Sequence, residues 1–279
     1  MGELTLSNQR KKVLFLTYGF SVGGAEMLLL NLLNGLNRER IEPIVVTLAK
    51  DGELEKGISE GIRLIRYARR FKLDFKPVVD IVRLVRRESI NAIFALDLFT
   101  YLFVRLAVLV NHSRLKVLVS LHTTKPRSIR DYFLTLAYSS MLDKRTILVT
   151  VCNAQARYWS QKYSIPVQRF ITVYNGVDAD HWTPRPPGFD RSSARMELGI
   201  EQNAFVILQV ATFRPEKGHL NSIQALSILH RTTSMKPYLL FVGGGNIQME
   251  NRLRSVTTSF SLDKYVIFSG QHSDIRRFY

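Results

Sequence analysis

Two cations placed directly after a predicted strand have the chemistry needed to bind a phosphate group. They are Arg214 and Lys217, in the segment Phe213-Arg-Pro-Glu-Lys-Gly218. Arginine and lysine form short, charge-assisted hydrogen bonds to phosphate oxygens. Because open α/β sheets bind ligands outside the carboxyl ends of their strands, this position favours a diphosphate site over an exposed turn with surface charges.

Two glycine-rich segments also follow predicted strands, and glycine allows a backbone to approach a ligand closely. One is Gly19-Phe-Ser-Val-Gly-Gly-Ala-Glu26, with Gly23 and Gly24, and the other is Val242-Gly-Gly-Gly-Asn246, with Gly244. The first segment precedes a predicted helix, whose free N–H groups attract anions. Its spacing matches neither G-x-G-x-x-G nor a Walker A loop, so a tight turn is an equal alternative. A flexible connector is the alternative for the second segment.

His122 ends a long apolar strand, in the segment Leu121-His-Thr-Thr124. A histidine at this position could donate a hydrogen bond to a ligand or take part in proton transfer. A lone histidine is more often structural, so the residues by themselves favour the structural alternative.

The sequence predicts no metal site. Asp178-Ala-Asp180 has the spacing of a D-x-D metal motif, but it follows the turn pair Asn175-Gly176. The single cysteine, Cys152, excludes an intrachain disulfide and a cysteine-built zinc site, and it agrees with a reducing cytoplasm. H-E-x-x-H, nucleophile-elbow and EF-hand patterns do not occur in the sequence.

Strand-like and helix-like segments alternate along the whole chain, which predicts an α/β fold with parallel sheets covered by helices. The predicted strands are residues 13–17, 42–48, 63–67, 92–95, 115–121, 147–151, 204–210, 238–242 and 265–268. The predicted helices are residues 25–36, 77–88, 128–142, 154–162, 218–230 and 248–260. The apolar stretch 96–110 contains Asp97 and Arg105 and is short for a bilayer span, so we expect a helix packed inside a domain.

A segment rich in Pro and Gly, residues 183–190, divides the chain. It predicts one domain over residues 10–185 and a second over residues 190–279. The second has about three strands, half of a doubly wound sheet, so we expect it to be incomplete.

The net charge of +16 favours an anionic partner. The basic residues that cluster most densely are Arg63, Arg66, Arg69, Arg70, Lys72, Lys76, Arg83, Arg86 and Arg87. A solvated helix face and a surface facing an anionic membrane are equal alternatives for this basic region. No nucleic-acid motif accompanies the charge, so nucleic acid is not an expected partner. The polar residues 1–9 lack the apolar core of a signal peptide, which predicts a cytoplasmic protein. If the basic region faces a membrane, the predicted location is peripheral, on the inner face of that membrane.

Several motifs together resemble retaining glycosyltransferases of family 4 in their order along the chain. They are Gly23-Gly-Ala-Glu26, Asn175-Gly-Val-Asp178, Arg214-Pro-Glu-Lys-Gly218, Val242-Gly-Gly-Gly245, and Val266-Ile-Phe-Ser-Gly270 followed by Asp274-Ile275. The resemblance implies a GT-B fold with two Rossmann-like domains, the second incomplete here. The N-terminal domain would take a glycan or lipid-linked acceptor, and the C-terminal domain would bind a nucleotide-sugar donor. Transfer would retain the anomeric configuration and need neither a metal nor another cofactor.

The resemblance also implies roles for particular residues. Gly23 and Gly24 would lie near the donor phosphates and the acceptor, and His122 would contact the transferred sugar. Lys217 would bind the diphosphate, and Gly244 would lie near the nucleotide.

This chain departs from the family pattern at three places. Thr212 stands where the family commonly has an arginine, which Arg214 could replace, and Thr123 stands where an acidic residue is common. The sequence also ends before the segment that carries two glutamates in the family, so we expect this chain to be inactive or severely impaired. An enzyme acting on a lipid-linked or cell-envelope glycan is therefore one interpretation, and a non-catalytic GT-B module is the alternative.

Overall fold

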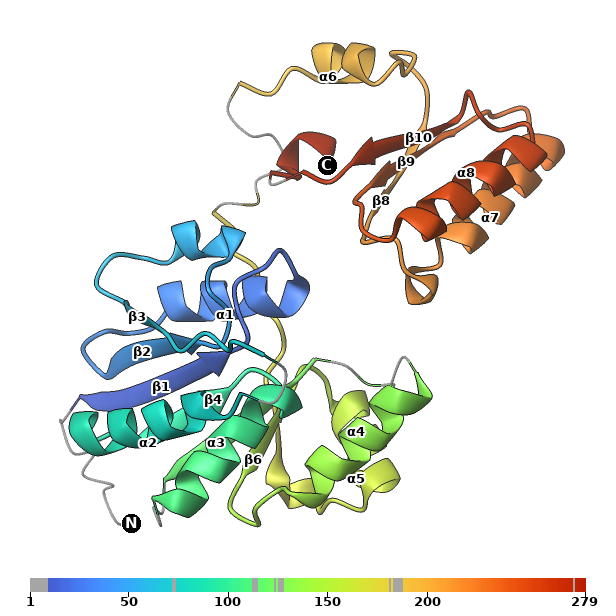
Figure 1. Ribbon diagram of the computed structural model, residues 1–279. Coiled ribbons are helices and arrows are strands. Elements are labelled where there is room, and N and C mark those ends of the chain that lie inside the picture. The colour runs from blue at the N-terminus through green and yellow to red at the C-terminus, as the bar shows by residue number, and fades with distance from the viewer. Residues whose placement is uncertain are drawn as a thin grey trace, which may run out of the picture. The chain divides into compact units, whose positions relative to one another are not determined.

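The protein consists of two compact units, each built on its own parallel sheet (Figure 1). The computed structural model describes residues 10–71, 74–111, 115–122, 124, 128–180, 182, 188–272 and 274–279. The N-terminal unit is Met1–Val177 and the C-terminal unit is Asp178–Tyr279. The predicted α/β class with a second, smaller parallel sheet is confirmed.

The N-terminal unit contains a seven-stranded parallel sheet with the order β3-β2-β1-β4-β5-β6-β7. Its strands are β1 (Lys11–Thr17), β2 (Ile41–Thr47), β3 (Arg63–Arg66), β4 (Ala92–Ala95), β5 (Lys116–Leu121), β6 (Ile147–Thr150) and β7 (Phe170–Thr172). The strand order reverses between β1 and β4. This reversal is the topological switch point at which open α/β sheets bind ligands.

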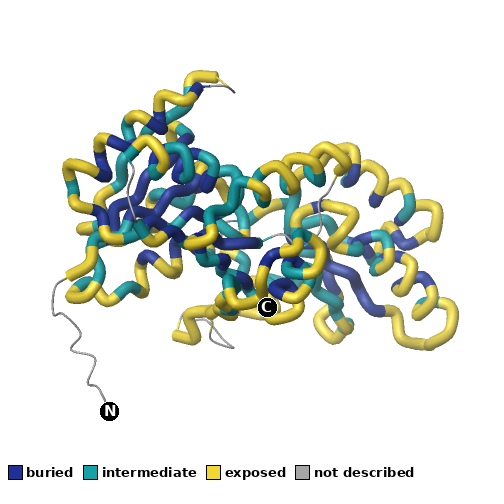
Figure 2. Tube along the Cα trace, turned by 90° about the horizontal axis from the view of Figure 1, so that it is seen from below, coloured by how far each residue is buried: buried dark blue, intermediate teal, exposed yellow. Residues whose placement is uncertain are grey.

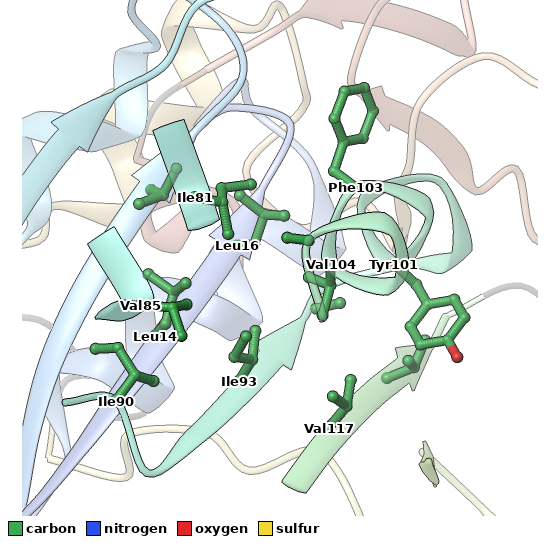
Figure 3. Close-up of a cluster of buried hydrophobic side chains, with 14 of the residues drawn as sticks. Leu14, Leu16, Ile81, Val85, Ile90, Ile93, Tyr101, Phe103, Val104 and Val117 are labelled. Atoms are coloured by element: carbon green, nitrogen blue, oxygen red, sulfur yellow. The ribbon is translucent and has the colours of Figure 1, made fainter. Parts of the chain in front are cut away.

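Helices cover both faces of this sheet. They are α1 (Gly24–Asn34), α2 (Lys76–Glu88), α3 (Leu98–Val110), α4 (Ile129–Ser140) and α5 (Asn153–Tyr163), with the short 3₁₀ helices η1 (Glu53–Gly57) and η2 (Val167–Arg169). Alternate residues of β1 pack on opposite faces, because side chains along a strand alternate in direction. Leu14 and Leu16 belong to the core shared with α2 and α3 (Figure 3), whereas Phe15 packs with α1.

The apolar stretch 96–110 forms the internal helix α3, as predicted. Asp97 caps it by accepting a hydrogen bond from the backbone N–H of Thr100 at 2.7 Å. Tyr101, Phe103 and Val104 are buried in the core (Figure 3). Within the described part of the chain, we find no helix whose length and apolar character would let it cross a bilayer.

The C-terminal unit contains a three-stranded parallel sheet with the order β10-β9-β8. Its strands are β8 (Val206–Val210), β9 (Tyr238–Val242) and β10 (Val266–Gly270). Its helices are α6 (Arg191–Glu197), α7 (His219–Thr232) and α8 (Ile247–Ser259), with the 3₁₀ helices η3 (Pro215–Lys217) and η4 (Arg276–Phe278). The central strand β9 is buried at all five positions, whereas β8 is half-buried throughout and β10 is buried only at Val266; Figure 2 shows the burial of each residue along the chain.

Several short elements were not predicted, namely β7, α6 and the four 3₁₀ helices. The two units divide between Val177 and Asp178, before the predicted linker at residues 183–190. Residues 183–187 of that linker lie outside the described residues, and the domain limits 10–185 and 190–279 stay a prediction.

Candidate functional site

His122 follows the last residue of β5 and lines a cavity of about 320 Å³ in the N-terminal unit. The walls of the cavity come from the end of β5 and the residues after it, from Asp97 at the start of α3, and from helices α3, α4 and α5. The lining residues are Asp97, Leu98, Phe99, Ser120, Leu121, His122, Thr124, Asp131, Leu134, Thr135, Tyr138, Trp159 and Tyr163. The cavity therefore lies at the carboxyl ends of the strands, where ligands bind in this class of fold.

Two side chains that line this cavity each carry a polar atom that is buried without a hydrogen-bond partner among the described residues. They are Nε2 of His122 and the hydroxyl of Tyr163. Buried polar groups are nearly always hydrogen-bonded in native proteins, because an unsatisfied group loses its hydration without compensation. These two groups are therefore candidate hydrogen-bonding groups for a polar ligand of the cavity.

Burial also sets the charge of these groups. Desolvation lowers the pKa of His122, and the nearby carboxylate of Asp97 opposes this shift only in part. Desolvation likewise raises the pKa of Tyr163. The cavity therefore presents a neutral imidazole and a protonated phenol near pH 7, which suit uncharged hydroxyl groups.

Helix α4 has an unusual distribution of side chains. Its inner face places Asp131, Thr135 and Tyr138 on the wall of the His122 cavity. Ile129, Phe133 and Leu136 follow the spacing of one helix face and are 79%, 62% and 44% exposed. The most exposed apolar side chains of α4 thus lie away from the His122 cavity, whereas the cavity face carries Asp131, Thr135 and Tyr138 together with Leu134.

Gly23 and Gly24 lie at the start of α1, after β1 and beside the switch point of the sheet. A Cβ atom on Gly23 would lie 2.3 Å from Oε2 of Glu26, so the absence of a side chain lets this carboxylate fold over the helix start. A Cβ atom on Gly24 would meet nothing within 4 Å. Neither glycine lines the His122 cavity.

In the C-terminal unit, the loops after β8 and β9 are joined by backbone hydrogen bonds. The N–H of Ala211 donates to the carbonyl of Val242 at 3.0 Å, and the N–H of Phe213 donates to the carbonyl of Gly244 at 2.9 Å. Gly243 allows this pairing, because a Cβ atom there would lie 2.1 Å from the carbonyl oxygen of Ala211. A glycine is therefore required at position 243 for these two strand ends to pack this closely.

Arg214 and Lys217 are both exposed at the carboxyl end of β8, where the sequence placed them. Arg214 lines a cavity of about 520 Å³ between the two joined loops, and Lys217 does not. The cavity is lined by Thr212, Phe213, Arg214, Pro215, Gly245, Asn246, Gln248, Met249 and Arg252. Gly244 lies beside it without lining it.

Sequence reasoning missed two polar residues of this cavity, Gln248 and Arg252, whereas Asn246 ends the glycine-rich segment that it identified. Asn246 caps α8 by accepting a hydrogen bond from the N–H of Met249 at 3.1 Å. Gln248 and Arg252 are four residues apart and therefore share a face of α8. That spacing is the signal in the sequence that could have identified them.

The turn expected at Asn175-Gly176 is not found, since residues 173–178 form no turn; a turn occurs instead at residues 179–180, where the carboxylate of Asp178 accepts a hydrogen bond from the N–H of Asp180 at 3.0 Å. In the portion of the chain that the structure describes, no three His, Cys, Asp or Glu side chains group together as metal ligands.

Comparison with known proteins identifies the family. A model of Glycosyltransferase Family 4 matches residues 22–181, and a model of Glycosyl transferases group 1 matches residues 190–279. The search of curated proteins found no match.

Solved structures of glycosyltransferases share the fold. Anabaena Alr3699/HepE in complex with UDP and glucose matches with a TM-score of 0.77 at 21% identity, over 96% of this chain and 72% of that one. A glycosyltransferase from Rickettsia africae matches with a TM-score of 0.76 at 20% identity, over 97% of this chain and 71% of that one. WaaG, a glycosyltransferase involved in lipopolysaccharide biosynthesis, matches with a TM-score of 0.70 at 15% identity, over 95% and 72%. The family matches, the two parallel sheets and these GT-B neighbours together show that the chain belongs to glycosyltransferase family 4.

Proposed function

We propose that this glycosyltransferase takes a sugar from a nucleoside diphosphate donor and transfers it to a glycan or lipid-linked acceptor with retention of anomeric configuration. The observation that carries the proposal is the position of Arg214 and Lys217, exposed at the carboxyl end of β8 in the unit matched by Glycosyl transferases group 1. Alr3699/HepE, which has a similar fold, binds UDP-glucose, a donor of this class.

The two cations suit the departing diphosphate of such a donor. Negative charge develops on the leaving group in the transition state, and fixed cations stabilise it. We propose that Arg214 and Lys217 supply this stabilisation without a metal ion. Gly23, Gly24 and Gly244 stay proposed contacts of the donor.

The His122 cavity suits a sugar. Its volume of about 320 Å³ falls within the range of small-molecule sites. The neutral ring of His122 and the hydroxyl of Tyr163 can form hydrogen bonds with sugar hydroxyls, and Tyr138 and Trp159 add aromatic surface to the walls. We propose that His122 contacts the transferred sugar or the acceptor in this cavity.

A lipid-linked acceptor is favoured by helix α4. The same helix lines the His122 cavity with one face and exposes Ile129, Phe133 and Leu136 with the other. An exposed apolar stripe of this kind can enter the outer layer of a membrane. We propose that α4 contacts a membrane that contains the acceptor lipid, which would place the protein peripherally on that membrane.

The basic region of residues 63–87 supports this contact less strongly than its sequence suggests. Five of its cations have carboxylate partners within 4 Å, which reduces its positive field. These pairs are Arg63–Glu88, Arg66–Glu55, Lys76–Asp80, Arg83–Asp80 and Arg87–Glu88. A solvated, ion-paired surface is therefore a sufficient account of most of this region.

Incubation with a panel of nucleoside diphosphate sugars tests the proposal, with polyprenyl-diphosphate-linked and free oligosaccharides as acceptors. We expect this chain to bind one of these donors, and any acceptor-dependent release of a nucleoside diphosphate should give a product that NMR shows to retain the configuration at the anomeric carbon. Lys217→Ala should weaken donor binding by about 1.5–3 kcal/mol, the range for a hydrogen bond to a charged group. Lys264→Ala, which removes an exposed lysine paired with Glu201, is the matched control.

Failure of the folded parent to bind any donor would contradict the proposed activity. Inversion at the anomeric carbon would contradict retention alone. Equal donor affinity in Lys217→Ala and the parent would remove Lys217 from the site.

A further inference from the structure

The 520 Å³ cavity of the C-terminal unit is lined by positively charged side chains and, among the described residues, by no acidic ones. Arg214 reaches it from the loop after β8, and Arg252 reaches it from α8. No Asp or Glu occurs among the described residues that line it. Two guanidinium groups beside one cavity create a positive potential that favours an anion.

A neighbouring arginine that does not line the cavity, in contrast, has a carboxylate partner. Arg254, two residues further along α8, pairs with Glu250 at 2.7 Å and lies 4.2 Å from the ring centroid of Phe268. Arg214 and Arg252 have no carboxylate partner in the described ranges of the chain. Their guanidinium groups are therefore available to a ligand.

Both arginines are attached to well-anchored backbone. Phe213, next to Arg214, is buried and its N–H is hydrogen-bonded to Gly244. Leu253, next to Arg252, is fully buried in the same core. A pair of cations on fixed elements loses little conformational entropy in the backbone when an anion binds.

The position of Thr212 relates this cavity to the donor site that the family resemblance implies. It occupies the position at which the resembled family commonly has an arginine, and it lines the same cavity as Arg214 and Arg252. Resting on the proposed function, we propose that Arg214 and Arg252 together bind the diphosphate group of the nucleotide-sugar donor in this cavity. Arg252, a residue outside the motifs of the family, thus supplies the second guanidinium. The start of α8 lines the cavity too, and its N–H groups add to the attraction for an anion.

Calorimetric titration of the whole chain with UDP, GDP and ADP, and separately with inorganic pyrophosphate, tests this inference. Arg252→Gln should weaken binding of pyrophosphate and of the preferred nucleotide by about tenfold or more. Arg252→Lys should lose less, because it keeps the charge without the forked guanidinium. Arg254→Gln is the matched control on the same helix and should stay within about twofold of the parent, since its partner is Glu250.

The outcomes separate this inference from the proposed function. Nucleotide binding that Lys217→Ala weakens and Arg252→Gln leaves unchanged would overturn the role of Arg252 and leave the function standing. Pyrophosphate binding that depends on Arg252, in a parent that binds no nucleotide, would support the arginine pair and contradict the function. A parent that binds neither probe would overturn both. Circular dichroism of each variant shows whether a loss comes from misfolding.

Discussion

At the scale of single residues, burial and charge act against each other at His122. Desolvation penalises its charged form more than the carboxylate of Asp97 favours it, so the pKa of His122 is lowered. The folded protein therefore binds fewer protons at this position than the unfolded chain does below about pH 6.5. Stability rises with pH wherever the unfolded state binds more protons, so the parent should lose stability as the pH falls below about 6.5.

His122→Gln should reduce this loss, because glutamine does not titrate. Burial also lowers the pKa of His219, whose shift the nearby backbone of Ala211 and Arg214 opposes, so the pH dependence should be reduced but not abolished. Urea unfolding at pH 7.5 and pH 5.5 measures the difference. An equal loss of stability in His122→Gln and the parent would show that the histidine is not desolvated. Lower activity of His122→Gln at both pH values would separately support its contact with a sugar.

At the scale of secondary structure elements, Phe213 connects the end of β8 to the loop that carries Arg214 and Lys217. It is buried against His219, with ring centroids 5.2 Å apart, and against Phe241 and Phe268, at 6.3 Å and 6.1 Å. Removing this ring leaves a cavity in the centre of the C-terminal unit. The arginine that follows it would then lose its anchor.

We expect Phe213→Ala to lower the free energy of unfolding of the C-terminal unit by about 3–5 kcal/mol. It should also weaken nucleotide binding through Arg214. Phe205→Ala, at an exposed phenylalanine in the same unit, should stay within about 0.5 kcal/mol of the parent. Denaturant unfolding followed by tyrosine and tryptophan fluorescence measures both, and similar losses in the two variants would argue against a specific anchoring role.

Helix α4 gives a second prediction at this scale, which concerns membrane binding. Replacing Ile129 and Phe133 by serine removes apolar surface that each would bury in a membrane, so vesicle affinity should fall by about tenfold or more. Val79→Ser, at an exposed apolar position of α2, is the matched control. Sedimentation with vesicles of phosphatidylglycerol and phosphatidylcholine measures the effect. Unchanged sedimentation of the α4 variant would place the membrane contact elsewhere, and a large loss on reversing Arg83 and Arg87 would assign it to the basic region.

At the scale of the whole molecule, the chain divides into two units with separate sheets and separate cores. Because the N-terminal unit contains a complete seven-stranded sheet with cores on both faces, residues 10–177 should fold when expressed alone. We expect a cooperative unfolding transition with a stability of about 5–15 kcal/mol. Circular dichroism during urea unfolding tests this, and a fragment without a cooperative transition would show that its core depends on the C-terminal unit.

Much of this architecture could be predicted from local sequence patterns. The alternation of apolar strands and helices predicted the main elements, because buried parallel strands are continuous apolar runs. The strand β7 was missed because it has only three residues and is not a continuous buried run. The helix α6 was missed because its seven residues are mostly polar and it buries none of them.

For the candidate site, the sequence by itself determined which strand ends have chemically useful residues. His122, Arg214 and Lys217 could be identified because a strand end followed by a polar residue is a local pattern. Only the tertiary structure decided which residues share a cavity with them. Tyr163 joins His122 because α5 packs beside β6 and β7, and Arg252 joins Arg214 because the loops after β8 and β9 are hydrogen-bonded together. Such pairings depend on contacts between segments about 40 residues apart, which no local periodicity encodes.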